Sequence, residues 1–579
     1  MGTISDKLMR IINTKEDIRQ ALISKGYDVP TSIPFKEYAK MILDLPCKVD
    51  SFPDIEGIVA RYSASGLTNE QMAANPVWVD KTGNGHDLQL KNFACKGMSG
   101  VGGYVADIDE WGTNSTAAYF ERNSIKITAT FKENVSLGLL YHNIKLRQSC
   151  VLKVTGIPEG CDAFLDDRLG NRFYMSEDGV YEIIPSNFLA EALYFSIEKY
   201  PERWYGSKLT IEQLPLYPGA LVFDGVDDWA GCDNLPLLPK EKGYSIIALR
   251  NWITRYDATQ YKRPLISNLD TNDEGAFLIE YRKDENVNDV TGSYNSFTDV
   301  YIDDNNPITW QTSSSYNGQI IKKGTSKSTN KLCICKTYFG QLSNYANAAI
   351  WEIVILDHDA TEEELTKIKD YFVKTYPWLF PDQAWTVVGK TNEDEDRATI
   401  ANITGNGNDL VLSNFGFAEG SGYNEEGEYA GYLVTDGVDD KITSSIFKMG
   451  NDWTVIGDWE LINTGKNDNA GIVKFDSIVI YNYNYNSVLI NIKNGRNILI
   501  PDQNTVNAIC SDGRIYSKDW KESIYNEETE STSKNFLTIG YSGNAYTKIA
   551  FKNLAIYPTV LSREDCIKAY NYLQTLKAK

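Results

Sequence analysis

An ordered series of motifs occurs twice in this chain, and that repetition restricts the fold more than any other feature. The stretch 66–88 contains Gly-Leu-Thr-Asn-Glu and Thr-Gly-Asn-Gly, and close matches to both return at 389–410. An Asp-Gly-Val-Asp-Asp motif closes the stretch 221–228 and also the stretch 433–440. Because the motifs keep their order, we predict two copies of one domain.

The spacing of the motifs locates an insertion in the first copy. Gly83 and Asp224 are 141 positions apart, whereas their counterparts Gly405 and Asp436 are 31 positions apart. The additional residues fall at 106–215 and contain their own β-branched and aromatic runs, separated by Gly-containing turns. We predict a small β-sandwich inserted in a surface loop, where the two loop ends can stay close together.

Strand patterns dominate both copies. Short runs of apolar, β-branched and aromatic residues, such as 275–281 and 478–483, alternate with turns built on Gly, Asn and Asp. Each copy ends with a strand and then a helix, which we expect to begin after Thr361 in the first copy and after Ser562 in the second. The copies are therefore predicted to be all-β apart from one closing helix each.

The first 46 residues form a unit of a different kind. Ile18 and Leu22 lie on one face of a predicted helix, and Phe35, Tyr38 and Ile42 recur at helical spacing in a second. Two helices this short cannot bury a core of their own. We expect this segment to dock on another protein or to assemble with copies of itself; the alternative is a helical cap on the next domain.

Two resemblances arise from these residues. The pattern Thr14-Lys15-x-x-Ile18, followed by Lys25-Gly26 and Pro34-Phe35-x-x-Tyr38, resembles the N-terminal segment of phage tail-fibre and appendage proteins. The Gly-Asn-Gly motifs, the Asp-Gly-Val-Asp-Asp turns and the closing strand–helix pairs resemble the laminin-G-like, concanavalin-A-like jelly-roll family. That family includes lectins, adhesive modules and structural modules, so its fold does not by itself imply one function.

The predicted fold is mainly β, with two antiparallel jelly-roll β-sandwiches, an inserted small β-sandwich and a short N-terminal helical segment. The predicted domains are 1–48 for the helical attachment segment, 54–105 with 216–380 for the first jelly roll, 106–215 for the insert and 381–579 for the second jelly roll.

Charge and hydropathy restrict the partners. The chain has 57 basic and 78 acidic residues, a formal net charge of −21, so we expect no nucleic-acid partner. No apolar run reaches the roughly 20 residues that a membrane helix needs, so we expect no membrane insertion, and no signal-peptide pattern follows Met1. The nine cysteines are scattered, and we expect most to be buried, reduced thiols.

The Asp-Gly-Val-Asp-Asp turns are the candidate metal sites. Asp227 and Asp228 in the first copy, and Asp439 and Asp440 in the second, offer the oxygen ligands that Ca²⁺ prefers. The jelly-roll resemblance implies that Ca²⁺ could bind at such a rim. The alternative is that the first Asp and the Gly form the turn while the other carboxylates are solvated, and no other cofactor is expected.

Aromatic side chains near polar turns are the candidate sugar platforms, because a ring face can pack against the apolar side of a pyranose. These candidates are Trp229, Trp310, Tyr316 and Trp520. Each has packing or surface exposure as its alternative role. No nucleophile pattern accompanies the three histidines, so we expect no catalytic residues and no enzyme, although a carboxylate pair for glycoside hydrolysis is kept as an alternative.

Together these features give one hypothesis about function. We expect a phage virion protein, a tail or head fibre or appendage subunit made in the host cytoplasm, attached to the particle through 1–48 by Ile18, Leu22, Phe35, Tyr38 and Ile42. Its partners would be other virion proteins, a host-surface glycan bound by the β-sandwiches, and further copies of itself in a dimer or trimer. The alternatives are a purely structural virion protein and a glycan-degrading virion enzyme.

Overall fold

The computed structural model describes residues 52–578 in part. The longer gaps are 254–262, 270–276, 282–292, 321–327, 337–344, 463–470 and 525–536, and further gaps span five residues or fewer. The chain divides into two compact units, Met1–Asp54 and Ile55–Lys579, of which only the second is described below. The predicted attachment residues Ile18, Leu22, Phe35, Tyr38 and Ile42 lie outside the described residues.

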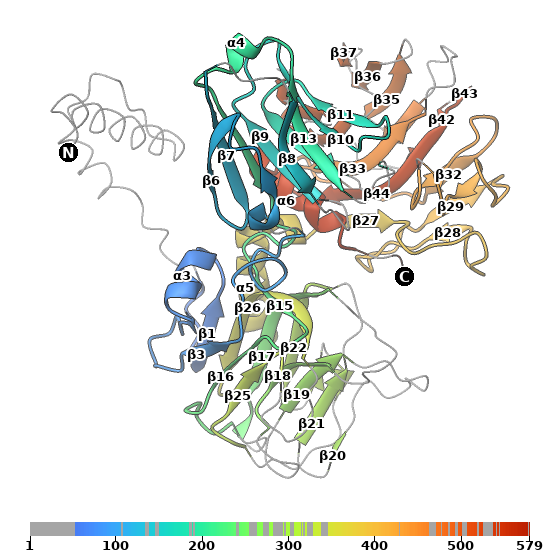
Figure 1. Cartoon of the computed structure of the whole chain (residues 1–579). Coiled ribbons are helices and arrows are strands. Elements are labelled where there is room, and N and C mark those ends of the chain that lie inside the picture. The colour runs from blue at the N-terminus through green and yellow to red at the C-terminus, as the bar shows by residue number, and fades with distance from the viewer. Residues whose placement is uncertain are drawn as a thin grey trace, which may run out of the picture. The chain divides into compact units, whose positions relative to one another are not determined.

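The described chain is mainly β, as predicted, and its strands form several almost entirely antiparallel sheets (Figure 1). One pair departs from this rule: β19 (Phe277–Tyr281) runs parallel to β21 (Phe297–Tyr301). The domain boundaries themselves stay a prediction, but no sheet combines strands of 112–213 with strands from the rest of the described chain.

Two eight-stranded sheets come from 58–101 and 221–356. The first sheet has the order β24 (Gln319–Ile320), β23 (Ser315–Tyr316), β22 (Ile308–Thr312), β17 (Ser245–Trp252), β26 (Asn347–Leu356), β15 (Leu221–Asp224) and β4 (Gly100–Val101), with β1 (Ile58–Ser63) also on β26. The second has the order β2 (Val77–Trp78), β3 (Leu88–Lys91), β16 (Trp229–Cys232), β25 (Leu332–Ile334), β18 (Arg263–Ser267), β19, β21 and β20 (Ser293–Tyr294).

Residues 112–213, which lie between these two parts in the sequence, form two five-stranded sheets. One has the order β11 (Arg172–Met175), β10 (Asp162–Asp166), β13 (Leu193–Glu198), β8 (Gly138–Ile144) and β5 (Gly112–Thr113). The other has the order β12 (Gly179–Ile183), β9 (Cys150–Thr155), β14 (Lys208–Gln213), β7 (Lys126–Phe131) and β6 (Ala118–Arg122). Short helix α4 (Pro201–Trp204) lies in the same stretch, and η1 (Ile108–Glu110) and α3 (Asn69–Ala74) precede it.

The C-terminal part repeats the paired eight-stranded sheets. One has the order β30 (Gly422–Tyr423), β31 (Leu433–Val434), β44 (Ile549–Tyr557), β33 (Thr454–Leu461), β38 (Val506–Cys510), β39 (Arg514–Ser517) and β40 (Glu522–Ile524), with β27 (Gln383–Thr386) also on β44. The other has the order β28 (Thr399–Ile400), β29 (Leu410–Ser413), β32 (Lys441–Ser444), β41 (Thr538–Ile539), β34 (Gly471–Phe475), β35 (Ile478–Tyr483), β36 (Ser487–Ile492) and β37 (Arg496–Ile500). A hairpin of β42 (Tyr541–Ser542) and β43 (Ala545–Tyr546) is separate.

Each pair of sheets encloses its own apolar core. Among the described residues, large clusters of buried side chains come from 59–355 without the insert, from 108–211 and from 385–556. A fully buried Val, Leu, Ile or Phe side chain contributes roughly 1.5–3 kcal/mol, so each pair of sheets gains most of its stability from its own core. Among the described cysteines only Cys95 is partly exposed, and all of them are free thiols.

The Gly-Asn-Gly motifs form matching turns, as the sequence predicts. Both glycines of each motif have φ between +72° and +82°, a region that glycine adopts without steric cost. The central Asn84 donates to the carbonyl of Val59 at 2.9 Å, and Asn406 donates to the carbonyl of Asp382 at 2.8 Å. The motif therefore ties its turn to the chain segment at the start of each sandwich.

A helix closes each copy, and its cap explains where it begins. Helix α5 (Glu362–Thr375) follows Thr361, which forms a capping box with Glu364, and leads to η4 (Pro377–Leu379). Helix α6 (Arg563–Leu573) follows Ser562, whose hydroxyl accepts from the N–H of Asp565 at 3.1 Å. Both caps are at the residues that the sequence predicts.

A buried ion pair holds α5 on the first sheet. The carboxylate of Glu352 on β26 is fully buried and lies 3.3 Å from Nε of Arg61 on β1. The hydroxyls of Tyr371 and Tyr376 donate to its other oxygen at 3.1 and 2.9 Å. Burial raises the pKa of Glu352, while Arg61 and the tyrosines oppose that shift.

We expect Glu352→Ala to destabilise the first sandwich by about 3–5 kcal/mol, because it removes the carboxylate that balances the buried charge of Arg61. Denaturant unfolding followed by tryptophan fluorescence measures the loss. The control is Glu363→Ala on the same helix: Glu363 is exposed and pairs with Lys367, a contact worth less than about 1 kcal/mol. Equal unfolding midpoints for the two variants would contradict the assignment.

Candidate functional site

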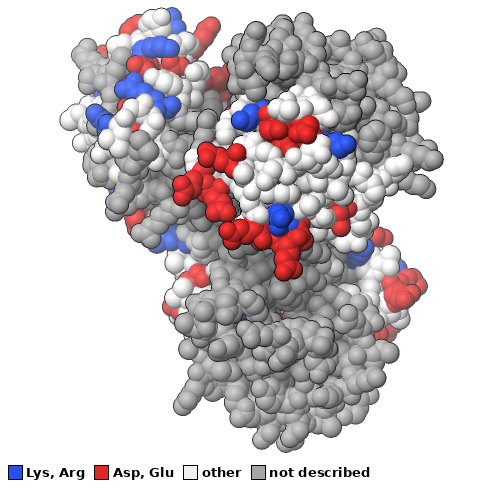
Figure 2. Space-filling model, turned by 90° about the vertical axis from the view of Figure 1, so that its right-hand side faces the viewer, with Lys and Arg blue, Asp and Glu red and all other residues white. Residues whose placement is uncertain are grey.

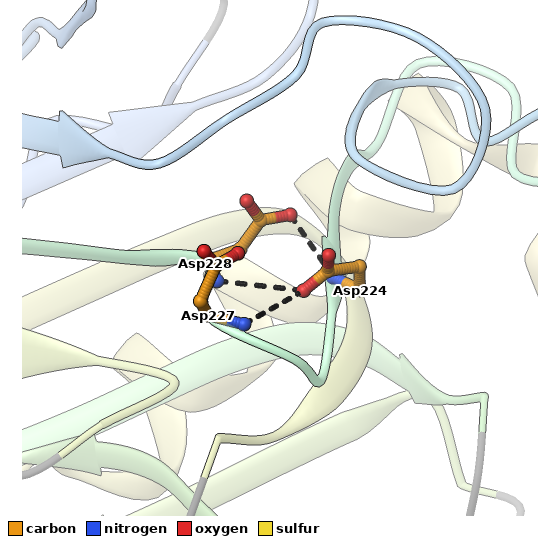
Figure 3. Close-up of side chains that lie close together, drawn as sticks. All are labelled: Asp224, Asp227 and Asp228. Carbon is orange, nitrogen blue, oxygen red and sulfur yellow. Dashed lines mark hydrogen bonds between the residues drawn. The ribbon is translucent and has the colours of Figure 1, made fainter. Parts of the chain in front are cut away.

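The Asp-Gly-Val-Asp-Asp turn of the first copy is organised around its first carboxylate. One oxygen of Asp224 accepts from the N–H groups of Val226, Asp227 and Asp228 at 2.8, 3.3 and 3.4 Å. Oδ2 of Asp228 in turn accepts from the N–H of Asp224 at 3.1 Å. Figure 3 shows the three carboxylates gathered on one side of the turn. The first and last Asp therefore fix the loop, and Asp227 is the exposed member.

The second copy repeats this arrangement almost atom for atom. Asp436 accepts from the N–H groups of Val438, Asp439 and Asp440 at 2.8, 3.2 and 3.3 Å, and Asp440 accepts from the N–H of Asp436 at 2.8 Å. An Asn side chain supports each turn from outside: Asn92 donates to the carbonyl of Asp227 and Asn414 to that of Asp439, both at 3.0 Å. Turn formation explains why the motif occurs twice.

The last Asp of each motif has an unpartnered oxygen. Asp228 and Asp440 have no exposed surface, yet Oδ1 of each has no hydrogen-bond partner. Burial raises the pKa of Asp228 to about 7 and that of Asp440 to about 6, and the neighbouring carboxylates add to both shifts. The side chains of Ser99 and Ser421 partly oppose these increases in pKa. Neither side chain, however, forms a hydrogen bond to Oδ1.

The same atoms fit a cation. In each turn the three carboxylates offer oxygens that all lie within 4.8 Å of one another. The orphaned Oδ1 atoms and the all-oxygen donor set match the preference of Ca²⁺, with the remaining ligands supplied by water. Ca²⁺ at Asp227 and Asp228, and at Asp439 and Asp440, therefore stays a prediction, and Asp224 and Asp436 are the further ligands that it would use.

We expect stability to depend on pH through these two groups. The pKa of Asp228 and of Asp440 in the folded chain lies above the ordinary aspartate value of 3.8, so the protonated carboxyl groups favour the folded state. Their contribution to stability is present below about pH 4 and is lost as the pH rises through about 7. The stability of the double variant Asp228→Asn/Asp440→Asn, relative to that of the native chain, should therefore be higher at pH 8 than at pH 5. Thermal unfolding at the two pH values measures this difference.

The exposed neighbours supply the control, and calcium supplies the second arm. Asp227→Asn/Asp439→Asn should keep most of the pH dependence, because burial is the largest cause of both pKa shifts and the charges of Asp227 and Asp439 add a smaller part. If Ca²⁺ binds, millimolar Ca²⁺ should raise the unfolding temperature of the native chain at pH 8 and have less effect on the Asp228→Asn/Asp440→Asn variant. No change in the native chain on adding Ca²⁺ would contradict the calcium prediction.

The aromatic candidates occupy different environments. Trp229 is half-buried, and the ammonium of Lys336 lies 4.7 Å from its ring centroid. Trp520 is only 2 % exposed and packs edge-on against Tyr570 of α6, which argues against it as a sugar platform. The side chain of Tyr316 lies outside the described residues. Trp310, the fourth candidate, is half-buried on β22 and lines a groove.

This groove has a volume of about 580 Å³, within the range of pockets that hold small molecules. Trp310 and its cross-strand neighbour Ile247 line it from the first sheet. It is also lined by Leu365 of α5, the linker at 379–382, the turn at 403–406, Pro558, and Tyr572 and Leu576 at and just beyond the end of α6. It therefore lies where the first sandwich, its closing helix and the second sandwich meet, and we refer to it as the inter-sandwich groove.

Polar and charged side chains line the groove together with Trp310, and the sequence analysis did not identify them as a site. They are Asn306, Glu362, Thr366, Lys369, Asp382, Thr404 and Asn406. Only Asn406 belongs to a recognised motif, the second Gly-Asn-Gly turn, which gives no sign of a site. Thr361 predicts the start of α5 and hence that Glu362 lies in its first turn, but no local pattern brings that turn next to Trp310.

No protein-family model and no curated protein matches this chain. Solved structures match parts of it. The receptor-binding domain of botulinum neurotoxin type G matches at 13 % identity and a TM-score of 0.21, over 33 % of this chain and 50 % of that one. The binding domain of Paraclostridial Mosquitocidal Protein 1 matches at 13 % and 0.22, over 32 % and 51 %. Trypanosoma rangeli sialidase matches at 9 % and 0.22, over 46 % and 48 %.

This chain therefore spans about half the length of the structures that it matches. Similarities at these TM-scores carry no argument about function, and the case for a function depends on this chain's own residues. In the described part of the chain, no helix is both long and apolar enough to cross a membrane.

Proposed function

We propose that this protein is an adhesion protein that binds glycans, and that the inter-sandwich groove is its sugar site. The observation that supports this most directly is the position of Trp310, a half-buried ring in a groove of ligand size that amide, hydroxyl and charged side chains also line. A ring face packs against the apolar face of a pyranose, and amides and hydroxyls bond its hydroxyl groups. The proposal assigns binding without catalysis.

Such a site would be weak by itself. One aromatic contact adds about 0.5–1.5 kcal/mol beyond the area that it buries, so a single groove would bind a sugar only modestly. Several grooves on one assembly would increase the affinity for a surface by avidity. This reasoning favours a dimer or trimer, which is part of the proposal.

The finer proposal is a virion fibre or appendage subunit, located on the phage particle. It is supported by the resemblance of 14–38 to the N-terminal segment of phage tail-fibre and appendage proteins and by the two β-sandwich copies that follow. In this proposal 1–48 attaches the chain to other virion proteins and the sandwiches face the host surface. A structural virion protein without glycan binding, and a glycan-degrading virion enzyme, are the alternatives that binding and product-release assays would separate.

We expect Trp310→Ala to weaken binding to a recognised glycan by about tenfold, because it removes the ring platform. A glycan array probed with the full chain identifies the ligand, and calorimetry measures the change. Trp229→Ala is the matched control, since Trp229 is another half-buried tryptophan that lies beside Lys336 and away from the groove. Equal losses in the two variants would contradict the assignment of the groove.

We expect deletion of 1–46 to abolish incorporation into particles while leaving the sandwich domains soluble and folded. Immunoblots of purified particles, with circular dichroism of the truncated chain, test this. Incorporation at the native level would contradict the attachment role of this segment without affecting the glycan proposal.

A further inference from the structure

The inter-sandwich groove also carries information about the class of sugar, an inference that rests on the proposed function. Its two amides keep both donors and acceptors. Oδ1 of Asn306 accepts from the N–H of Ile308 at 3.0 Å, which leaves its two amide N–H groups and a second lone pair. The amide nitrogen of Asn406 donates to the carbonyl of Asp382 at 2.8 Å, which leaves its oxygen and its second N–H. A hydroxyl group, which both donates and accepts, suits this pair.

The charged side chains in the groove favour an uncharged ligand. Glu362 and Asp382 contribute two carboxylates, and Lys369 contributes one ammonium. A sugar carboxylate or phosphate would gain from Lys369 but meet two negative charges in the same groove. The local balance therefore opposes anionic ligands.

Helix α5 provides no compensating anion site at its start. The partial positive charge of a helix N-terminus attracts anions, but Glu362, Glu363 and Glu364 already occupy the first turn. The carboxylate of Glu364 also bonds back to the N–H of Thr361 at 2.8 Å. The N–H groups and dipole that could have bound an anionic sugar are thus neutralised by the chain itself.

The wider surface acts in the same direction. Figure 2 shows Asp and Glu side chains gathered in a band across the described part of one face, with few Lys and Arg beside them. The whole chain has a net charge of −21, which repels anions at a distance and slows their approach. Repulsion of this kind weakens as salt is added.

We infer that the inter-sandwich groove selects uncharged oligosaccharides and excludes anionic ones such as sialylated or uronate-containing glycans. Its volume of about 580 Å³ suits a ligand of drug size, which for a carbohydrate is a di- or trisaccharide. Trp310 would contact the apolar face of one ring, while Asn306 and Asn406 bond hydroxyls of the ligand.

The experiment compares matched pairs of glycans on the full-length chain. Suitable pairs are N-acetyllactosamine with its sialylated form, and neutral glucan oligomers with glucuronate oligomers, at low and at high salt. We expect the neutral member to bind about tenfold more tightly at low salt, and the difference to shrink at high salt. Trp310→Ala should abolish most of the binding of the neutral member.

A charge variant tests the cause of the selection. Glu362→Gln/Asp382→Asn should reduce the discrimination within each pair, whereas Glu363→Gln, one residue along the same helix and outside the groove, should leave it unchanged. Equal or tighter binding of the anionic members would overturn this inference and leave the adhesion function standing. Binding of no member at either salt concentration would overturn both.

Discussion

The buried carboxylate of Glu352 is the interaction on which the candidate site most depends. It lies on the central strand β26 and is contacted by Arg61, Tyr371 and Tyr376, which come from the first strand, the closing helix and the linker beyond it. Removing one member of such a buried cluster is expensive because the remaining charge has no water to solvate it. The cluster therefore fixes the position of α5, and α5 forms one wall of the inter-sandwich groove.

In the second copy, different residues connect the closing helix to the sheet. Asn553 occupies the place of Glu352 and donates to Gln574 beyond α6 at 3.3 Å. Gln574 in turn donates to Asp458, which also lies 3.4 Å from the ammonium of Lys552. The turns of the two copies have been kept nearly identical while the contacts under the helices have diverged. This contrast shows that the turns serve the fold and that the helix contacts differ with each helix's surroundings.

Local patterns predicted the parts of the structure that depend on local physics. The glycines of the Gly-Asn-Gly motifs, the caps at Thr361 and Ser562 and the role of Asp224 and Asp436 in their turns all follow from a few adjacent residues. Trp520 shows the limit: its position near polar turns made it a candidate sugar platform, yet its ring is buried and packs against Tyr570, fifty positions later. The inter-sandwich groove was out of reach for the same reason: the residues that line it are spread along the sequence from Ile247 to Leu576, and no local pattern among them indicates a site.

The way that the first sandwich accommodates the insert has a consequence for how the chain can change. The segments on either side of the insert are joined by paired backbone bonds: Val101 lies opposite Leu221, and the N–H of Tyr217 donates to the carbonyl of Gly102 at 2.8 Å. The two ends of the insert are thus held together by backbone pairing, which we call its stem. Exchanging the insert need not disturb this pairing. The insert also contacts α6, because the hydroxyl of Tyr570 on this helix donates to the carboxylate of Glu182 in the insert at 2.7 Å. A replacement module would therefore have to supply both a matching stem and a new surface for α6.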